Sequence, residues 1–411
     1  MRTNFAAPAH GRLGWRRMLQ GLFIAAALVI LAAPMVVQFA QRDAPRRVEN
    51  RPPTEQPAMP TSLAGLPAWT AGIDAWLKDH FGFRNSYVDA LDQIHYWAFG
   101  AFTSPQILMG REGRVFLASH AAGEGYRNSL VLTSCGAAVP QARREDIARG
   151  LGMVLERTDA ASPATRALAI LVPSSAALYP QHLPGWLEQQ CRRAPPLLDG
   201  IVAAMPEALR PRVLNLRPVL AGMDSATPAI PRTHFHWLGA GPRRSAQWIA
   251  EEALGRLPAF PLPTRVMRRR SDITGFFPGL RLEAEVTLAD EERAGVVVCT
   301  GPSCIDAAVG PEATRLLDDV RRYDSPAPDG RLLLLTDSFG AYVASGFTPY
   351  FRQVVQVSLN NLPRMPAGDR ARLREALIAR YRPDTLLFLV HDYAATYYWD
   401  ILLRDLLPAP P

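Results

Sequence analysis

The chain has 411 residues, of which 48% are hydrophobic and 20% are charged, a composition that supports a large buried core and excludes a disordered protein. Its formal net charge of +7 favours anionic partners, but almost all basic residues are arginines, and a biased codon usage explains the excess as well. The sequence contains no P-loop, repeat or nucleic-acid-binding module, so we expect no nucleic-acid partner, and we expect no metal or cofactor.

The N-terminus predicts a membrane anchor. Residues 1–17 contain four arginines, and residues 18–40 are uncharged and apolar, long enough as a helix to cross a hydrocarbon core of roughly 30 Å. The positive-inside tendency keeps residues 1–17 in the cytoplasm. The alternative is a signal peptide cleaved near small residues such as Ala40, but the apolar stretch exceeds the usual core of roughly 7–15 residues. We therefore expect a single-pass inner-membrane protein whose folded part is periplasmic.

The folded domain is predicted over residues 68–411. Residues 41–67 are rich in Pro, Arg and polar residues, as expected of a linker. Apolar residues at helical spacing then predict two helices between residues 68 and 99, broken at Gly82. Residues 107–117 resemble two short strands around a glycine turn.

Further along the chain, predicted helices and strands alternate. Helices are predicted over residues 145–158, 195–208, 240–257, 341–350 and 367–381, and strands over residues 167–172, 212–216, 332–335, 354–359 and 385–390. This alternation is typical of an α/β fold in which helices cover both faces of a parallel sheet. Residues 266–298 interrupt it with alternating, β-branched segments and Gly and Pro turns, which predict a β-rich insertion that forms a rim or a lid.

The four cysteines suit an oxidising compartment and lack the paired spacing of a zinc site. Three disulfide pairings are possible. We predict Cys135–Cys191 and Cys299–Cys304, because the sequence from Cys299 to Cys304 is a turn that a local disulfide can close.

Ser338 is the first candidate catalytic residue. It follows an apolar strand that ends in Asp337-Ser338, and open α/β sheets bind ligands at the carboxyl ends of their strands. An ordinary strand-to-helix junction explains the pair equally well, because Asp and Ser are common N-caps. A second segment places His234 and His236 beside a tryptophan. Serine needs a base to accept its proton and histidine is the usual one, so Ser338 and His236 together predict acyl transfer.

Three motifs, in this order, resemble the alginate O-acetyltransferase family, the AlgJ/AlgX-like group of SGNH-hydrolase-like proteins. They are Trp76-Leu-Lys-Asp-His-Phe-Gly-Phe-Arg84, Met109-Gly-Arg-Glu-Gly-Arg-Val-Phe116 and Val172-Pro-Ser-Ser-Ala-Ala-Leu-Tyr-Pro-Gln-His-Leu-Pro184. The resemblance covers most of the chain after the anchor. It implies an SGNH-hydrolase-like, flavodoxin-like fold and a Ser-His-Asp triad whose Asp and His come from an Asp-x-His-Trp motif.

Carried onto this sequence, the resemblance makes Ser338 the nucleophile and His236 the base, but the Asp position falls on His234. The carboxylate normally fixes the imidazole tautomer and stabilises the imidazolium, which a second imidazole does poorly. Three readings remain open: a Ser-His dyad, a carboxylate from elsewhere, or a site that binds glycan without catalysis. Asp392, which follows the strand over residues 385–390, is the preferred substitute, and Asp337 is the weaker choice.

Further residues are expected at the rim of the sheet. The backbone N–H of Ser338 is the first expected oxyanion donor, and a side-chain amide of Asn360 or Asn361 is the second. Both asparagines also suit a turn and helix cap before Pro363. Tyr350 could line the cleft, or it could simply end an amphipathic helix.

Together these features predict a periplasmic O-acetyltransferase that acetylates hydroxyls of an exported polysaccharide through a serine acyl-enzyme. The residues alone indicate acyl transfer, whereas the resemblance implies the acetyl group, the polysaccharide and a membrane-bound O-acyltransferase that supplies the acetyl unit. The alternatives are a carbohydrate acetyl esterase and a non-catalytic, polysaccharide-binding scaffold of an export complex.

Overall fold

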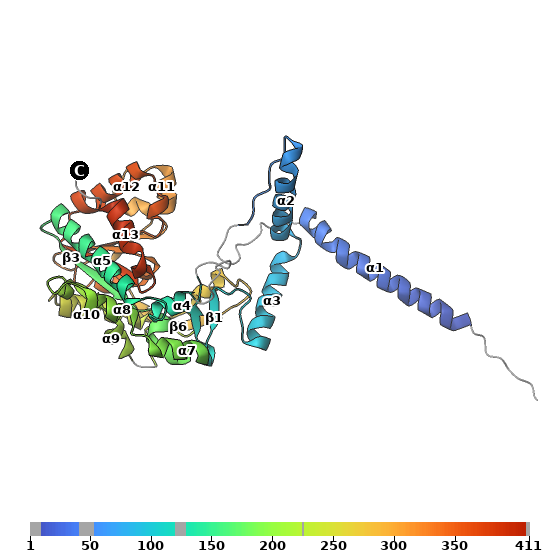
Figure 1. Cartoon of the computed structure of the whole chain (residues 1–411), viewed down its shortest axis with the longest axis horizontal. Coiled ribbons are helices and arrows are strands. Elements are labelled where there is room, and N and C mark those ends of the chain that lie inside the picture. The colour runs from blue at the N-terminus through green and yellow to red at the C-terminus, as the bar shows by residue number, and fades with distance from the viewer. Residues whose placement is uncertain (1–9, 41–52, 120–128, 224–225, 408–411) are drawn as a thin grey trace, which may run out of the picture. The chain divides into compact units, whose positions relative to one another are not determined.

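The computed structural model describes residues 10–40, 53–119, 129–223 and 226–407 (Figure 1). The chain divides into two compact units. Unit 1 contains the residues up to Phe99 together with Thr274–Leu280, and unit 2 contains Gly100–Ile273 together with the chain from Arg281 onward. The predicted cytoplasmic segment (residues 1–17) and linker (residues 41–67) lie partly outside the described residues.

Unit 1 is helical. It contains α1 (His10–Ala40), α2 (Leu66–His80) and α3 (Arg84–Phe99), so the two helices predicted on either side of Gly82 are confirmed. In the described part of the chain, α1 is the one helix long and apolar enough to cross a membrane, with a mean hydropathy of 2.3 over residues 18–38. Signal sequences meet the same criterion, so α1 is a candidate for either an anchor or a signal sequence.

Unit 2 is built on a mixed sheet, not on the parallel sheet that the sequence predicts. Among the described residues, seven strands form this sheet in the order β4-β3-β11-β9-β10-β8-β7. The first five are parallel to one another, and β8 is antiparallel to both of its neighbours, β10 and β7. The chain passes from β8 to β9, on the other side of β10, in only six residues, 325–330, and so short a connection brings the chain back in the opposite direction. The strands are β3 (Arg166–Val172), β4 (Val213–Asn215), β7 (Val297–Thr300), β8 (Val320–Asp324), β9 (Arg331–Thr336), β10 (Gln353–Ser358) and β11 (Thr385–His391).

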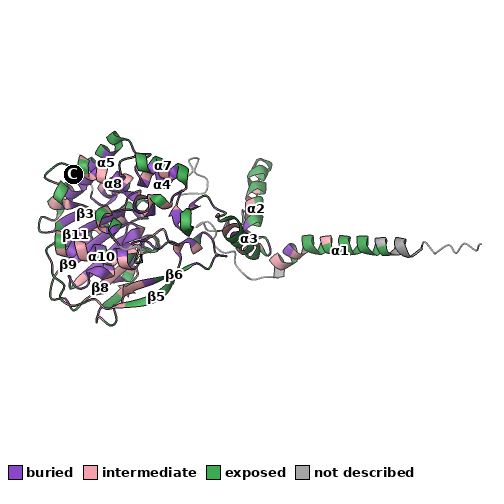
Figure 2. Ribbon diagram, turned by 90° about the horizontal axis from the view of Figure 1, so that it is seen from below, coloured by how far each residue is buried: buried purple, intermediate pink, exposed green. Residues whose placement is uncertain are grey.

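Both faces of the sheet are covered, which explains the continuous apolar runs of its central strands. The four leucines of β9, Leu332 to Leu335, are all completely buried. Figure 2 shows that the central strands of this unit consist mainly of buried residues. On one face pack α5 (Gln141–Ala161), α8 (Leu197–Ala204), α12 (Ala367–Arg374) and α13 (Tyr398–Ile401), and on the other α9 (Arg217–Ala221) and α10 (Ala240–Trp248).

The segment predicted as a helix over residues 341–350 is different in the structure. It consists of two short 3₁₀ turns, η8 (Ser338–Tyr342) and η9 (Ala344–Phe347). Gly346 and Pro349 interrupt the segment and Gly340 precedes it, and glycine and proline are the poorest helix formers. The chain therefore turns tightly after Ser338 instead of continuing as one long helix.

Residues within the predicted β insertion form an antiparallel pair, β5 (Thr264–Arg270) with β6 (Glu283–Ala289). The end of this range, Val297–Val298, instead begins β7 of the central sheet. The predicted short hairpin is confirmed as β1 (Ile107–Met109) paired with β2 (Val115–Leu117).

All four cysteines are described, and they form Cys135–Cys191 and Cys299–Cys304, so the predicted pairing is confirmed. The first disulfide joins the chain just after α4 (Ser129–Ser134) to α7 (Gly185–Arg193).

Candidate active site

Ser338 lies at the carboxyl end of β9, where the chain turns into η8. The turn is fixed by Asp337, whose Oδ1 accepts a hydrogen bond from the backbone N–H of Phe339 at 2.8 Å. A Cβ on Gly340 would lie 2.1 Å from Thr336 Oγ1, so the turn closes only around glycine. These local contacts hold the serine at the edge of the sheet.

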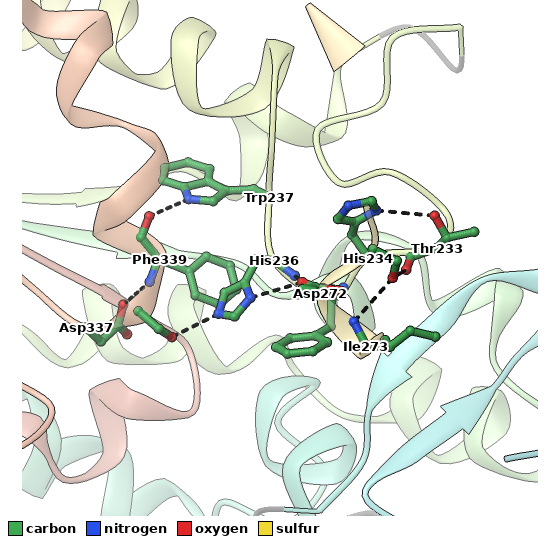
Figure 3. A network of polar contacts seen from close by, with 11 residues as sticks. Thr233, His234, His236, Trp237, Asp272, Ile273, Asp337 and Phe339 are labelled. Atoms are coloured by element: carbon green, nitrogen blue, oxygen red, sulfur yellow. Dashed lines mark hydrogen bonds and ion pairs between the residues drawn. The ribbon is translucent and has the colours of Figure 1, made fainter. Parts of the chain in front are cut away.

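His236 lies between the hydroxyl of Ser338 and the carboxylate of Asp272, and Figure 3 labels His236 and Asp272. Its Nε2 is 3.0 Å from Ser338 Oγ, and its Nδ1 is 3.0 Å from Asp272 Oδ2. The carboxylate of Asp272 also accepts hydrogen bonds from the backbone N–H groups of His236, at 2.9 Å, and Phe235, at 3.3 Å. The three side chains therefore form a continuous Asp272–His236–Ser338 chain, the arrangement in which a carboxylate orients a base against a nucleophile.

A buried tryptophan links the histidine segment to the serine segment. The Trp237 indole N–H donates to the carbonyl oxygen of Phe339 at 2.7 Å, and Trp237 is completely buried (Figure 3). The two hydrogen-bonded residues are the chain neighbours of His236 and Ser338. This hydrogen bond therefore helps to hold the backbone at His236 and the backbone at Ser338 in place relative to each other.

The carboxylate beside His236 is thus neither of the two that the sequence suggested. Asp272 follows β5, within the predicted β insertion, and lies 36 residues from His236 in the sequence. The sequence places Asp272 within the predicted β-rich insertion, but no pattern connects it to His236. His234, which occupies the Asp position of the Asp-x-His-Trp motif, is buried, and its Nδ1 is 3.2 Å from Thr233 Oγ1. Burial lowers the pKa of His234, which favours a neutral imidazole there.

Asp392, the preferred substitute carboxylate, is completely buried and holds loops together instead. Its oxygens accept hydrogen bonds from Ser134 Oγ at 2.7 Å, from Ser174 N at 2.8 Å and from Tyr393 N at 2.8 Å. The Asp392 side chain therefore ties α4 and the loop after β3 to the end of β11.

Asp337, the weaker substitute, contacts a different histidine. Its Oδ2 accepts from the backbone N–H of His391 at 2.7 Å and lies 2.6 Å from His391 Nδ1. Burial acts to lower the pKa of His391, but the charge of Asp337 and this hydrogen bond outweigh burial and raise it. Asp337 therefore joins the nucleophile turn after β9 to the end of β11.

Two of the other predicted rim residues, Asn361 and Tyr350, form hydrogen bonds with groups outside the triad. Asn361 Nδ2 donates to the carbonyl oxygen of Leu316 at 3.2 Å, and Asn360 is an exposed residue just after β10. Tyr350 is buried and its hydroxyl donates to Glu251 at 2.7 Å. Tyr342, which no sequence pattern singled out, has its ring centroid 5.8 Å from that of His236.

A cavity of about 360 Å³, which we call the triad cavity, lies beside Asp272, the triad residue that lines it. Asp272, His234 and Tyr342 contribute to its wall. Five arginines also line it, namely Arg243, Arg265, Arg269, Arg270 and Arg321, against two carboxylates, Asp272 and Glu291. Within the described part of the chain, only Arg321 of these five forms an ion pair, at 3.0 Å from Asp319. The triad cavity is therefore strongly positive.

A scan against protein-family models finds no match, and neither does a search of curated proteins. Among solved structures, the chain is similar to a DHHW family protein from Eubacterium siraeum, with 13% identity, a TM-score of 0.48 and coverage of 74% of this chain and 97% of that one. It is similar to the O-acetyltransferase domain of Pseudomonas putida AlgJ, with 15% identity, a TM-score of 0.41 and coverage of 71% and 92%. It is also similar to Pseudomonas aeruginosa AlgX, with 12% identity, a TM-score of 0.39 and coverage of 74% of this chain and 64% of that one. These structural neighbours include two proteins of the AlgJ/AlgX-like group, but at these identities and TM-scores they establish neither the family nor the activity of this chain.

Proposed function

We propose that this chain is a periplasmic, serine-dependent O-acetyltransferase with an SGNH-hydrolase-like domain, and that it acetylates hydroxyl groups of an exported polysaccharide. The observation that carries the proposal is the Asp272–His236–Ser338 chain, with two contacts of 3.0 Å. The motif resemblance supports the acetyl group and the polysaccharide. The complete chain of hydrogen bonds favours catalysis over a binding-only scaffold.

In the first half of the reaction, Ser338 Oγ attacks the acetyl carbonyl of the donor and His236 Nε2 accepts the serine proton. Asp272 holds the Nδ1–H tautomer and stabilises the imidazolium that forms. The tetrahedral intermediate collapses, His236 returns the proton to the leaving group, and the acetyl group remains as an ester on Ser338. A donor supplied by a membrane-bound O-acyltransferase fits an inner-membrane anchor formed by α1.

In the second half, a sugar hydroxyl gives its proton to His236 and attacks the acetyl ester. The acetylated glycan is released, and His236 returns that proton to Ser338 Oγ. The backbone N–H of Ser338 is the expected donor to the oxyanion in both halves. Because Asn361 already donates to Leu316, Asn360 is the remaining asparagine for the second donor.

The positive charge of the triad cavity favours a polyanionic acceptor. Arg243, Arg265, Arg269 and Arg270 form no ion pair within the described residues, so their guanidinium groups are available to carboxylate or sulfate groups. A planar guanidinium binds a carboxylate through two parallel hydrogen bonds, which favours a uronic acid polymer.

The test uses the full-length protein in detergent, with 4-nitrophenyl acetate as donor and polygalacturonate as acceptor. We expect acetyl groups on the polymer with the wild type and with Ser303→Ala, an exposed serine outside the triad cavity, and none with Ser338→Ala. Release of free acetate with no acetylated polymer would show an esterase instead. Polymer acetylation by Ser338→Ala at the wild-type rate would refute the proposal.

A further inference from the structure

A second, larger cavity lies along α10. It has a volume of about 980 Å³, at the upper end of the range of roughly 300–1,000 Å³ that small-molecule sites occupy. Its lining includes Arg244, Gln247, Trp248 and Glu251 from α10 and the turn that follows it, and Phe260 from the segment before β5. From Arg244 to Glu251, at about 1.5 Å per residue, the helical wall extends for about 10 Å. We call this the distal cavity.

The distal cavity and the triad cavity share walls. Arg243 and Gly346 line both of them. A Cβ on Gly346 would lie 2.7 Å from the Cβ of Ala246, so η9 and α10 approach each other closely at this boundary. The two cavities therefore meet where these two segments touch.

Three stretches of chain continue from one cavity into the other. The first begins two residues after His236, with residues 238–239 in the triad cavity and residues 240–251 in the distal cavity. The second begins three residues after Ser338, with residues 341–346 in the triad cavity and residues 346–350 in the distal cavity. The third runs from residues 258–262 in the distal cavity to residues 265–272 in the triad cavity. Each stretch thus has a residue of the triad at or near the end that lies in the triad cavity.

The distal cavity combines aromatic and hydrogen-bonding side chains. Trp248 and Phe260 are half-buried, and flat apolar rings of this kind suit the C–H faces of sugar rings. Glu251 accepts hydrogen bonds from the Tyr350 hydroxyl at 2.7 Å and from Gln247 Nε2 at 3.2 Å. These bonds fix polar groups on two walls before any ligand binds. Arg244 is exposed and adds a positive charge.

We propose that the distal cavity is a saccharide-binding subsite that holds the acceptor chain beyond the sugar residue positioned at the triad cavity. The proposal rests on the proposed function and extends it, because it makes the enzyme select a chain rather than a single sugar. Trp248 and Phe260 stack on sugar rings, while Arg243 and Arg244 bind acidic groups along the chain. Affinity then grows with the number of linked sugars that reach past Arg243.

The experiment measures binding of oligosaccharides by calorimetry to the full-length Ser338→Ala protein in detergent. The probes are oligogalacturonates of two, four and eight residues, with cello-oligosaccharides and chito-oligosaccharides of the same lengths as further backbones. We expect at least one backbone to bind about tenfold more tightly as the octamer than as the dimer. Trp248→Ala and Arg244→Gln, each added to Ser338→Ala, should remove most of that gain and leave dimer binding within about twofold. Trp186→Ala, an exposed tryptophan on α7, is the matched control.

Equal affinity for dimer and octamer in every backbone that binds, or equal loss for both lengths in Trp248→Ala and Arg244→Gln, would overturn the subsite. Failure of every probe to bind would overturn it too. If Trp248→Ala destabilises the fold, Arg244→Gln still tests the subsite, because Arg244 is exposed and its replacement leaves the core unchanged. Failure of the proposed function is a separate result, seen in the wild type as absence of acetyl-Ser338 after exposure to 4-nitrophenyl acetate.

Discussion

Replacing Asp272 by asparagine tests the role of the carboxylate that the sequence motif does not supply. The Asp272 carboxylate faces His236 Nδ1 at 3.0 Å and accepts from the backbone N–H of His236 at 2.9 Å. Asparagine has the same shape but only one acceptor oxygen. If that oxygen serves the backbone N–H, the amide NH₂ faces Nδ1 and drives the proton onto Nε2, where it prevents the imidazole from accepting the Ser338 proton.

The expected loss follows from the wrong tautomer and from the missing charge beside the imidazolium. Both act in the transition state, so the rate of Ser338 acetylation should fall on the order of 10³–10⁴-fold, which corresponds to about 4–5 kcal/mol. The assay is stopped-flow release of 4-nitrophenol from 4-nitrophenyl acetate by Asp272→Asn, with thermal unfolding measured to confirm that the protein is folded. Asp329→Asn, a largely exposed carboxylate that pairs with Arg256, is the control. An Asp272→Asn protein within tenfold of the wild type would refute the triad and favour a Ser-His dyad.

Three further predictions concern the surroundings of the triad. Arg269→Gln should weaken polygalacturonate binding several-fold at low salt and by less at high salt, because the cavity acts through charge, and calorimetry at two salt concentrations measures this. Equal weakening at both concentrations would contradict it. Gly340→Ala should lower the free energy of unfolding by about 1–3 kcal/mol and slow Ser338 acetylation, since its Cβ would lie 2.1 Å from Thr336 Oγ1, and urea unfolding with stopped-flow assay checks both. Finally, Asp337 raises the pKa of His391, so this pair contributes stability that is fully present below the unfolded pKa of about 6.5 and is lost as pH rises through the higher folded value. The difference in Tm between wild type and His391→Asn should therefore shrink from pH 5 to pH 9, by scanning calorimetry, and a constant difference would contradict it.

The sequence predicts the parts of the fold in which local pattern and burial agree. The leucine run of β9 and the helical spacing of α5 are local signals, and both elements form where they are predicted. The mixed sheet was not predicted, because no strand was expected over the residues of β8, and the direction of β8 is set by its pairing with β10 and β7. The segment after Ser338 has helical composition on average, but Gly340 and Gly346 lie where the chain must approach other backbone or side chains closely.

At the candidate active site, too, some residues have a local sequence signal and others depend on the tertiary structure. Ser338 and His236 each follow from a short motif, and their side chains lie 3.0 Å apart in the structure. Asp272 could not be assigned, because it lies 36 residues from His236 in the sequence and contacts it only in the folded structure. Asp392 and Tyr350 have the residue types of a site, but their hydrogen bonds to Ser134 and Glu251 depend on tertiary packing.

The measurement that tests the central claim most directly is peptide mapping of the full-length protein after brief exposure to 4-nitrophenyl acetate. The account predicts one acetyl group on the peptide that contains Ser338, removed when an acceptor polysaccharide is added, and no such peptide in Ser338→Ala. Acetyl groups spread over surface side chains, with an unmodified Ser338 in folded and oxidised protein, would contradict it.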